Sequence, residues 1–410
     1  MARARGAGVI AARVHNVLAR LEGESDAPAV VLMSHYDSVP TGPGAGDAAA
    51  GVASLLETAR ALRAGRPLAN DVIVVITDGE ESGLLGARAF ADEHPWMADV
   101  GLVLNFEARG NAGLVTMFET SDGNGALVRQ MADAAPHPWA SSLSYEVYRR
   151  MPNDTDLTVT RQAGAAGLNF AMIGNHAAYH TELDTPALLD RRSLQHMGSY
   201  ALALARRFGG LDLETLVASD AVYFNPIGTW LFVYSVGTAR VLAVLAVGVL
   251  AAVFWVARRR GLTTAGAVGK GVIAGLALPV VCALLMGALW NLVEHLFPRL
   301  LAAPHGDPYA AMTILLAFLM IALAMAMVVA GVAETLDALS LQIGLLGLWA
   351  VLTVTLSFTV AGASYLTLWP TLVGGLALGT FVLLGDGARR RGTAPVSYTH
   401  LTLPTKVLVC

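Results

Sequence analysis

Residues 72–81 read VIVVITDGEE. Five consecutive apolar residues, all of them β-branched valine or isoleucine, predict a strand that is buried on both faces. Strands of this kind are typical of parallel sheets covered by helices. Glu80 and Glu81 follow the end of this strand, where α/β proteins place their ligand-binding residues. The stretch therefore predicts a mostly parallel sheet with a functional site at its carboxyl edge.

The segments on either side of this strand repeat the pattern. Strands are predicted over residues 29–33, 102–106, 114–118 and 167–173, and helices over 48–62, 83–91 and 191–208. Strands that alternate with helices along a chain indicate an α/β fold. We therefore expect an α/β domain over residues 1–210, beginning abruptly close to its first strand.

The second half of the chain has a different composition. It contains apolar runs at 238–257, 271–297, 309–333, 341–360 and 366–384, each close to the roughly 20 residues that span a bilayer. One such run could be a buried helical core, but five in succession favour membrane helices. The sequence predicts an all-α transmembrane bundle over 238–390, a linker over 211–237, and membrane lipid as a partner.

Composition excludes several classes of function. The net charge of -4 gives no reason to expect nucleic acid as a partner. The two cysteines, Cys282 and Cys410, lie outside the α/β domain, which therefore has neither a disulfide nor a thiol nucleophile. The serines that follow predicted strands, Ser34, Ser38 and Ser82, have no Gly-x-Ser-x-Gly context, which argues against a serine hydrolase.

Potential metal ligands gather at the ends of the predicted strands. His35 and Asp37 follow the first strand, Asp47 begins the next helix, Glu107 follows a later strand, and His180 follows the last. Each residue alone is weak evidence, because single acidic residues are commonly turn or surface residues. Carboxylates packed together at one edge are costly unless cations neutralise them. Together with the two glutamates after residue 79, they suit zinc or a similar divalent ion.

The motifs around these residues resemble those of the M28 zinc peptidases. The matching stretches are 35–40 (HYDSVP), 44–52 (GAGDAAAGV) and 80–86 (EESGLLG). Three more resemble the multi-pass membrane branch of that family: 105–110 (NFEARG), 151–156 (MPNDTD) and 179–185 (YHTELDT). The resemblance runs from about residue 14 to residue 208. It implies a zinc-exopeptidase-like fold and a hydrolase that acts on peptides or proteins.

The resemblance also implies two Zn²⁺ ions per chain and a role for each ligand. Asp47 would bridge the two ions. His35 and Glu107 would complete one site, and Glu81 and His180 would complete the other. Two zinc ions in this arrangement hold and activate the water that hydrolyses the peptide bond.

Two further residues have catalytic roles by the same resemblance. Glu80 would be the general base, and Asp37 would hold the second ring nitrogen of His35 and so fix its tautomer. The sequence departs from the wider family twice. Residues 47–51 read DAAAG where DNASG is usual, and Glu107 stands where many soluble aminopeptidases have aspartate. The longer side chain puts the metal spacing and the recognition of an amino-terminus in question.

Substrate contacts are the least determined part of the expected site. Arg149, Arg150 and Asp156 lie in a loop that could contact substrate, and Tyr179 precedes a ligand. The family contains aminopeptidases, carboxypeptidases and cyclases. We expect an exopeptidase, with aminopeptidase favoured, and the sequence leaves the oligomeric state open.

Two other functions remain as alternatives. A catalytically inactive receptor or scaffold domain on a membrane anchor would keep the fold, although the expected ligands and base are all present in this sequence. A transporter with an accessory enzymatic domain would use ionisable groups near the apolar runs, at Glu294, His295, Glu334 and Asp337. Residues at helix ends that face water explain those four more simply.

Basic residues predict the orientation in the membrane. Arg258, Arg259, Arg260 and Lys270 lie between the first two apolar runs, and residues 389–391 are three arginines after the fifth. Because cytoplasmic loops are enriched in lysine and arginine, we expect the α/β domain on the non-cytoplasmic face. The alternative is a cytoplasmic domain with inverted helices.

The two ends of the sequence carry a separate expectation. Residues 1–20 have no continuous apolar core and are not a signal peptide. A domain placed on the non-cytoplasmic face needs an export signal, so we expect a membrane helix missing upstream. Within the tail 391–410, residues 396–410 look like translated adapter sequence, with a natural short tail as the alternative, and they are excluded from the fold prediction.

Overall fold

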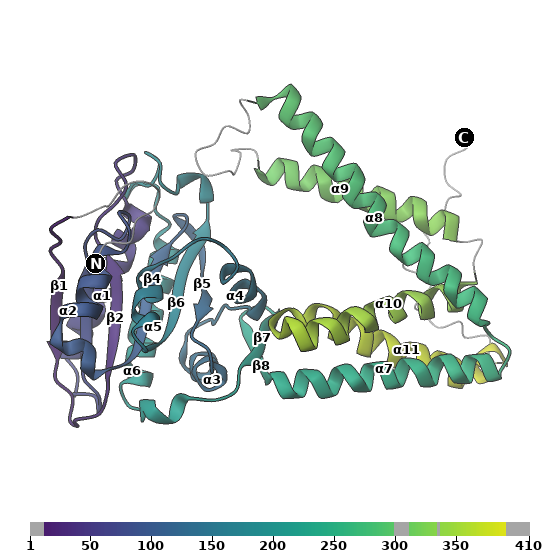
Figure 1. The fold of residues 1–410 in the computed structure, drawn as a ribbon, viewed down its shortest axis with the longest axis horizontal. Coiled ribbons are helices and arrows are strands. Elements are labelled where there is room, and N and C mark those ends of the chain that lie inside the picture. The colour runs from purple at the N-terminus through teal and green to yellow at the C-terminus, as the bar shows by residue number, and fades with distance from the viewer. Residues whose placement is uncertain (1–11, 299–310, 334–336, 391–410) are drawn as a thin grey trace. The chain divides into compact units, whose positions relative to one another are not determined.

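The computed structural model describes residues 12–298, 311–333 and 337–390 (Figure 1). The described chain forms two compact units, which meet in sequence between Val236 and Gly237. The expected non-native segment 396–410 lies outside the described residues.

A six-stranded sheet forms the centre of the first unit. Its strand order is β1-β3-β2-β4-β6-β5, with bounds β1 Val17–Leu21, β2 Ala29–His35, β3 Val72–Thr77, β4 Val100–Ala108, β5 Ala112–Thr120 and β6 Ala166–Gly174. The pairs β3–β2, β2–β4 and β4–β6 are parallel, and the edge strands β1 and β5 are antiparallel to their neighbours. The sheet is therefore mixed with a parallel centre, and the expected α/β class is confirmed.

The central strands are apolar throughout because both faces of the sheet are covered. Every residue of β2 and of β3 is buried. Side chains on a strand point alternately to opposite faces, so Val72 and Val74 enter one core while Ile73 and Val75 enter the other. Burying a valine or isoleucine side chain stabilises the fold by about 1.5–3 kcal/mol. A single apolar strand thus contributes side chains to both hydrophobic cores.

Helices complete the two cores. Their bounds are α1 Gly51–Arg63, α2 Leu85–Glu93, α3 Gly125–Ala134, α4 Ser142–Tyr148, α5 Asp156–Gln162 and α6 Arg191–Phe208. Leu55 of α1 and Tyr200 of α6 pack into one core, while Phe90 of α2 and Leu157 of α5 pack into the other. The helix expected over 48–62 begins at Gly51. In the turn before it, Ala45–Ala50, the backbone angles of Asp47 and Ala48 are not helical.

The expected linker, 211–237, is folded instead. It holds a helical turn, Leu213–Leu216, and an antiparallel hairpin of β7 (Ala221–Ile227) and β8 (Trp230–Ser235). Tyr223 is fully buried in the core of the first unit, and its backbone N–H donates to Ser142 Oγ. The linker prediction was wrong because each strand of the hairpin is too short to give a clear periodicity, although its apolar residues close the core.

The second unit is helical. Its helices are α7 Val236–Arg259, α8 Ala265–Leu296, α9 Ala311–Ala333, α10 Ala338–Thr359 and α11 Tyr365–Arg390. Among the described residues, four spans are long and apolar enough to cross a membrane: Val236–Arg259, Ala265–Leu296, Ala338–Thr359 and Tyr365–Leu384. The third of the five expected runs is also helical and lies in α9, with an apolar stretch at Met312–Val328 among the residues whose burial the structure describes.

Candidate metal centre

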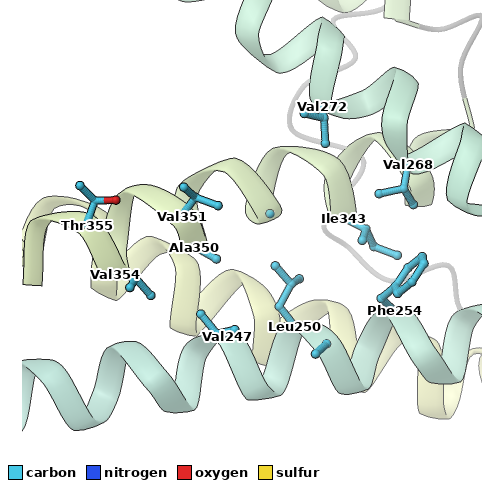
Figure 2. Close-up of a pocket in the computed structure, with 12 residues that line it drawn as sticks. Val247, Leu250, Phe254, Val268, Val272, Ile343, Ala350, Val351, Val354 and Thr355 are labelled. Carbon is cyan, nitrogen blue, oxygen red and sulfur yellow. The ribbon is translucent and has the colours of Figure 1, made fainter.

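Two cavities differ sharply in chemistry. In the helical unit, residues of α7, α8 and α10 line a cavity of about 500 Å³ (Figure 2). Its lining is aliphatic except for Phe254 and Thr355, and it contains no charged group. In the α/β unit, a cavity of about 980 Å³ is lined by several carboxylates and two histidines. Only the second offers groups that can bind a cation or move a proton.

The topology of the sheet gathers the residues of the second cavity. His35 is the last residue of β2, Glu107 lies one residue from the end of β4, and Glu80 and Glu81 follow the end of β3. These three strands are adjacent and parallel, so their carboxyl ends meet at one edge. His180 reaches the same cavity from the segment after β6.

Five of these side chains form two groups that share one carboxylate. His35 Nε2 lies 3.3 Å from Asp47 Oδ1 and 3.2 Å from Glu107 Oε2. His180 Nε2 lies 3.1 Å from Asp47 Oδ2 and 3.0 Å from Glu81 Oε1. The ligand atoms within each group all lie within 4.8 Å of one another. Asp47 therefore presents one oxygen to each group.

This donor set fits a pair of zinc ions. Ligand atoms about 2.0–2.2 Å from a tetrahedral zinc ion are about 3.3–3.6 Å apart, slightly longer than the separations of 3.0–3.3 Å in the two groups. Imidazole nitrogen and carboxylate oxygen are also the ligand types that zinc accepts. Each group supplies three protein ligands, as catalytic zinc sites do, which leaves a fourth position for water or substrate.

The sequence of this unit matches a known family. Residues 16–205 match the family model described as Peptidase family M28. This match covers 190 of the 410 residues, all of them within the first unit. The five candidate ligands and Glu80 all fall inside the matched residues.

The relatives of the chain are proteases by name. It is 32% identical over 232 residues to endoplasmic reticulum metallopeptidase 1 of Mus musculus, covering 54% of this chain and 26% of that protein. It is 33% identical over 226 residues to the vacuolar membrane protease of Saccharomyces cerevisiae, covering 54% of this chain and 23% of that protein. The chain thus spans about a quarter of the length of these relatives.

Solved structures show a more distant likeness. A zinc aminopeptidase from Bacillus subtilis, BSAP, is 23% identical, with a TM-score of 0.39, covering 46% of this chain and 48% of that chain. An aminopeptidase from Aneurinibacillus sp. strain AM-1 is 21% identical, with a TM-score of 0.39, covering 52% of this chain and 50% of that chain.

Electrostatics in this cavity of the α/β unit favour a bound cation. Burial lowers the pKa of His35, but the charge of Glu107 and the hydrogen bond with Asp47 outweigh it and raise this pKa well above its usual value. The same balance, with hydrogen bonds to neighbouring carboxylates, raises the pKa of His180 to about 9. Burial raises the pKa of Glu80 well above its usual range, outweighing the opposite effect of His35. A divalent cation would relieve the repulsion among these carboxylates.

Asp37 occupies a different position from the one its expected role requires. Its backbone carbonyl oxygen lies 2.9 Å from His35 Nδ1, while its carboxylate oxygen Oδ1 is 3.7 Å from that nitrogen. The carboxylate accepts the backbone N–H groups of Glu80 at 3.0 Å and Glu81 at 3.2 Å. Asp37 therefore fixes the ring of His35 through its carbonyl and shapes the glutamate turn through its side chain.

The expected substrate contacts separate into two groups. Tyr179 lines the cavity, and its ring stacks on the ring of His180 with centroids 3.7 Å apart. Arg149 and Arg150 do not line the cavity, because both pair with Glu146 on α4, at 3.1 and 2.6 Å.

Asp156 does not line the cavity either. Its side chain is fully buried at the first turn of α5, where it accepts a hydrogen bond from Thr77 Oγ1. A loop at this position could bring Asp156 to substrate, but the helix that begins there turns its side chain into the protein.

Sequence reasoning missed residues that support the candidate ligands. Asp184 is buried and accepts the backbone N–H groups of Gly46 at 2.8 Å and Asp47 at 3.0 Å, which holds the turn that carries Asp47. Asn105 donates to Glu107 Oε1 at 3.0 Å. Both stand inside motifs that resemble the family, and that position was the only signal for them.

The helical unit gives no support to a transporter site among its described residues. Glu294 and His295 are exposed on α8, and Asp337 caps α10 by accepting the N–H of Ser340 at 2.9 Å. Glu334 lies outside the described residues. The first three are helix-end groups rather than members of a buried cluster.

Proposed function

We propose that the chain is a membrane-anchored, zinc-dependent peptidase that hydrolyses peptide bonds at a two-ion centre. The observation that carries the proposal is the sharing of Asp47 between two ligand groups, one with His35 and Glu107 and one with Glu81 and His180. The M28 family match and the names of the metallopeptidase relatives support it.

Each residue at the edge of the sheet has a task in this reaction. When bound, a pair of zinc ions supplies a hydroxide near neutral pH and polarises a peptide carbonyl group. Glu80 lines the cavity but belongs to neither ligand group, so its carboxylate is available as a general base. It takes a proton from water and passes it to the leaving amine. Tyr179, beside His180, is a proposed substrate contact.

Exopeptidase action is the favoured specificity, with cleavage from the amino-terminus. Besides the candidate ligands, the cavity wall carries two carboxylates, Glu80 and Asp154. A negatively charged wall attracts a positively charged amino-terminus. Arg88 and Arg109 also line the cavity, so the end from which peptides are cut must be measured.

Digestion of a peptide library by the purified, zinc-loaded, full-length chain, analysed by mass spectrometry, tests the proposal. We expect products that lack residues from one end, mostly the amino-terminus. If the chain binds zinc and leaves every peptide intact, the α/β domain serves as a scaffold or receptor and the proposed enzyme is refuted.

The helical unit would hold this domain at a bilayer. Four apolar spans support membrane anchoring, and the arginines at the end of α7 support a non-cytoplasmic position for the domain.

A further inference from the structure

A chain of buried polar side chains crosses the sheet behind the candidate ligand Glu107. Asn105 on β4 pairs in register with Asn169 on β6, and Asn169 pairs in register with Glu119 on β5. Both asparagines are fully buried, and Glu119 is 3% exposed. Polar groups buried this deeply are costly unless they bond to one another.

The contacts along this polar chain are continuous. Asn105 Nδ2 donates to Glu107 Oε1 at 3.0 Å and to Asn169 Oδ1 at 3.2 Å. Asn169 Nδ2 donates to Glu119 Oε2 at 2.9 Å. At the far end, Arg161 donates to Glu119 Oε1 at 2.7 Å. A continuous series of hydrogen bonds thus links the candidate ligand Glu107 to Arg161.

The two carboxylates set the direction of the hydrogen bonds between them. An ionised carboxylate only accepts, whereas an amide has a donor end and an acceptor end. Glu119 requires the NH₂ group of Asn169, so the amide oxygen of Asn169 faces Asn105. Asn105 must then turn its own NH₂ group toward this oxygen and toward Glu107. The charge of Glu119 therefore orients the amide of Asn169, and Asn169 together with Glu107 orients the amide of Asn105.

Stability alone is a weak reason for such an arrangement. A buried ion pair with its hydrogen bonds is often no more stabilising than apolar residues of the same volume. The strand positions beside the two asparagines are apolar, so an apolar alternative fits the sheet. What the polar chain supplies instead is a fixed orientation for the side chain at its inner end.

We propose that Asn105, Asn169 and Glu119 are positioning residues that hold Glu107 as a one-oxygen metal ligand. Glu107 Oε1 stays on Asn105, so that Oε2, which lies 3.2 Å from His35 Nε2, is the oxygen that faces the ion. The inference rests on the proposed metal centre. It makes the affinity of one ion depend on Glu119, a residue two amides away from any ligand.

Glu119→Gln tests this inference because it keeps the size of the side chain and removes its charge. Glutamine can donate as well as accept, so Asn169 is free to turn over and the direction of the chain is lost. The probe is Co²⁺, titrated into metal-stripped, full-length protein in detergent and followed by calorimetry and visible absorption. We expect one of the two Co²⁺ ions to bind about 10–100-fold more weakly, with little change in the other.

A second variant, Asn105→Asp, acts closer to the ligand. It replaces the donor to Glu107 by an acceptor of the same shape, and we expect it to weaken the same binding step further. Glu107→Gln, which alters the ligand itself, identifies that step in the titration. Weakening of the other step by Glu119→Gln would refute the proposal.

Glu146→Gln is the matched control. Glu146 is also a buried glutamate, 8% exposed and paired with two arginines, but it is not part of the contacts that lead to Glu107. We expect wild-type binding of both ions in this variant, and thermal unfolding of the metal-free proteins checks that all variants fold. Equal losses in Glu119→Gln and Glu146→Gln, or no loss in Glu119→Gln, would overturn the inference. A wild-type chain that binds both ions but cuts no peptide refutes the proposed function and leaves this inference standing.

Discussion

Replacing Glu80 distinguishes catalysis at the site from metal binding. Glu80 lines the cavity beside Glu81 but belongs to neither ligand group. We expect Glu80→Gln to keep its zinc content and to lose hydrolysis by a factor of about 10²–10⁴, the usual contribution of a general base. Rate measurements with elemental analysis of the same sample check this. Cleavage at the wild-type rate would show that another group moves the proton.

Asp47, unlike Glu80, belongs to both candidate ligand groups. Its two oxygens serve different groups, at 3.3 Å from His35 Nε2 and 3.1 Å from His180 Nε2. We expect Asp47→Ala to lose at least one zinc ion per chain, measured by elemental analysis after dialysis. Asp154→Ala, at another acidic residue of the cavity wall, is the control and should keep both. Two tightly bound zinc ions in Asp47→Ala would place the shared ligand elsewhere.

The sequence predicts the candidate ligands better than the residues that support them. His35, Glu81 and Glu107 follow strands that are visible as apolar runs, and parallel strands bring their ends together. Asp184 and Asn105 act through hydrogen bonds to a backbone turn and to a ligand. Such bonds need no fixed spacing in the sequence, so no pattern reveals them before the fold is known.

At the scale of elements, long apolar segments are predictable and short ones are not. The buried strands β2 and β3 are found from their composition, because both faces of each strand are covered. The edge strand β1 has one exposed face and a mixed composition, and no strand was predicted there. The hairpin of β7 and β8 lies where the sequence predicts a linker, because strands of seven and six residues are too short to show a clear periodicity.

Glycines set the approach of α8 and α10 in the helical unit. A Cβ atom added at Gly344 would lie 2.7 Å from the carbonyl oxygen of Val268 and 2.7 Å from the backbone nitrogen of Val272. Because backbone cannot move aside as a flexible side chain can, we expect Gly344→Ala to lower the thermal stability of the helical unit in detergent, by about 1–3 kcal/mol.

Gly347 provides the matched control on the same helix. A Cβ atom added there meets nothing within 4 Å. Alanine is a better helix former than glycine by about 1 kcal/mol, so Gly347→Ala should be neutral or stabilising. Equal unfolding temperatures for Gly344→Ala and Gly347→Ala would contradict the close approach of α8 and α10 at Gly344.

At the scale of the whole molecule, hydropathy alone separates the two units. The change of composition near residue 230 corresponds to the boundary at Val236, where β8 has ended and α7 begins. The number of spans is less certain from composition, because an apolar run fixes neither the helix ends nor the loops. Four of the five expected runs are apolar helices of spanning length among the described residues, and the remaining run forms α9, Ala311–Ala333.

The orientation of the chain in the membrane is the last prediction. Arg258 and Arg259 end α7, Arg260 follows, and α8 begins at Ala265, so three arginines lie at the junction between the two spans. Cytoplasmic loops are enriched in such residues, which places this junction in the cytoplasm and the α/β domain on the opposite face. Single cysteines at Val217, which is 84% exposed, and at Ala265 report the two sides once both native cysteines are replaced. In sealed vesicles with the cytoplasmic face outward, an impermeant maleimide should label Ala265→Cys at once and Val217→Cys only after permeabilisation. The reverse order would establish a cytoplasmic α/β domain, and immediate labelling of both would mean that α7 does not cross the bilayer.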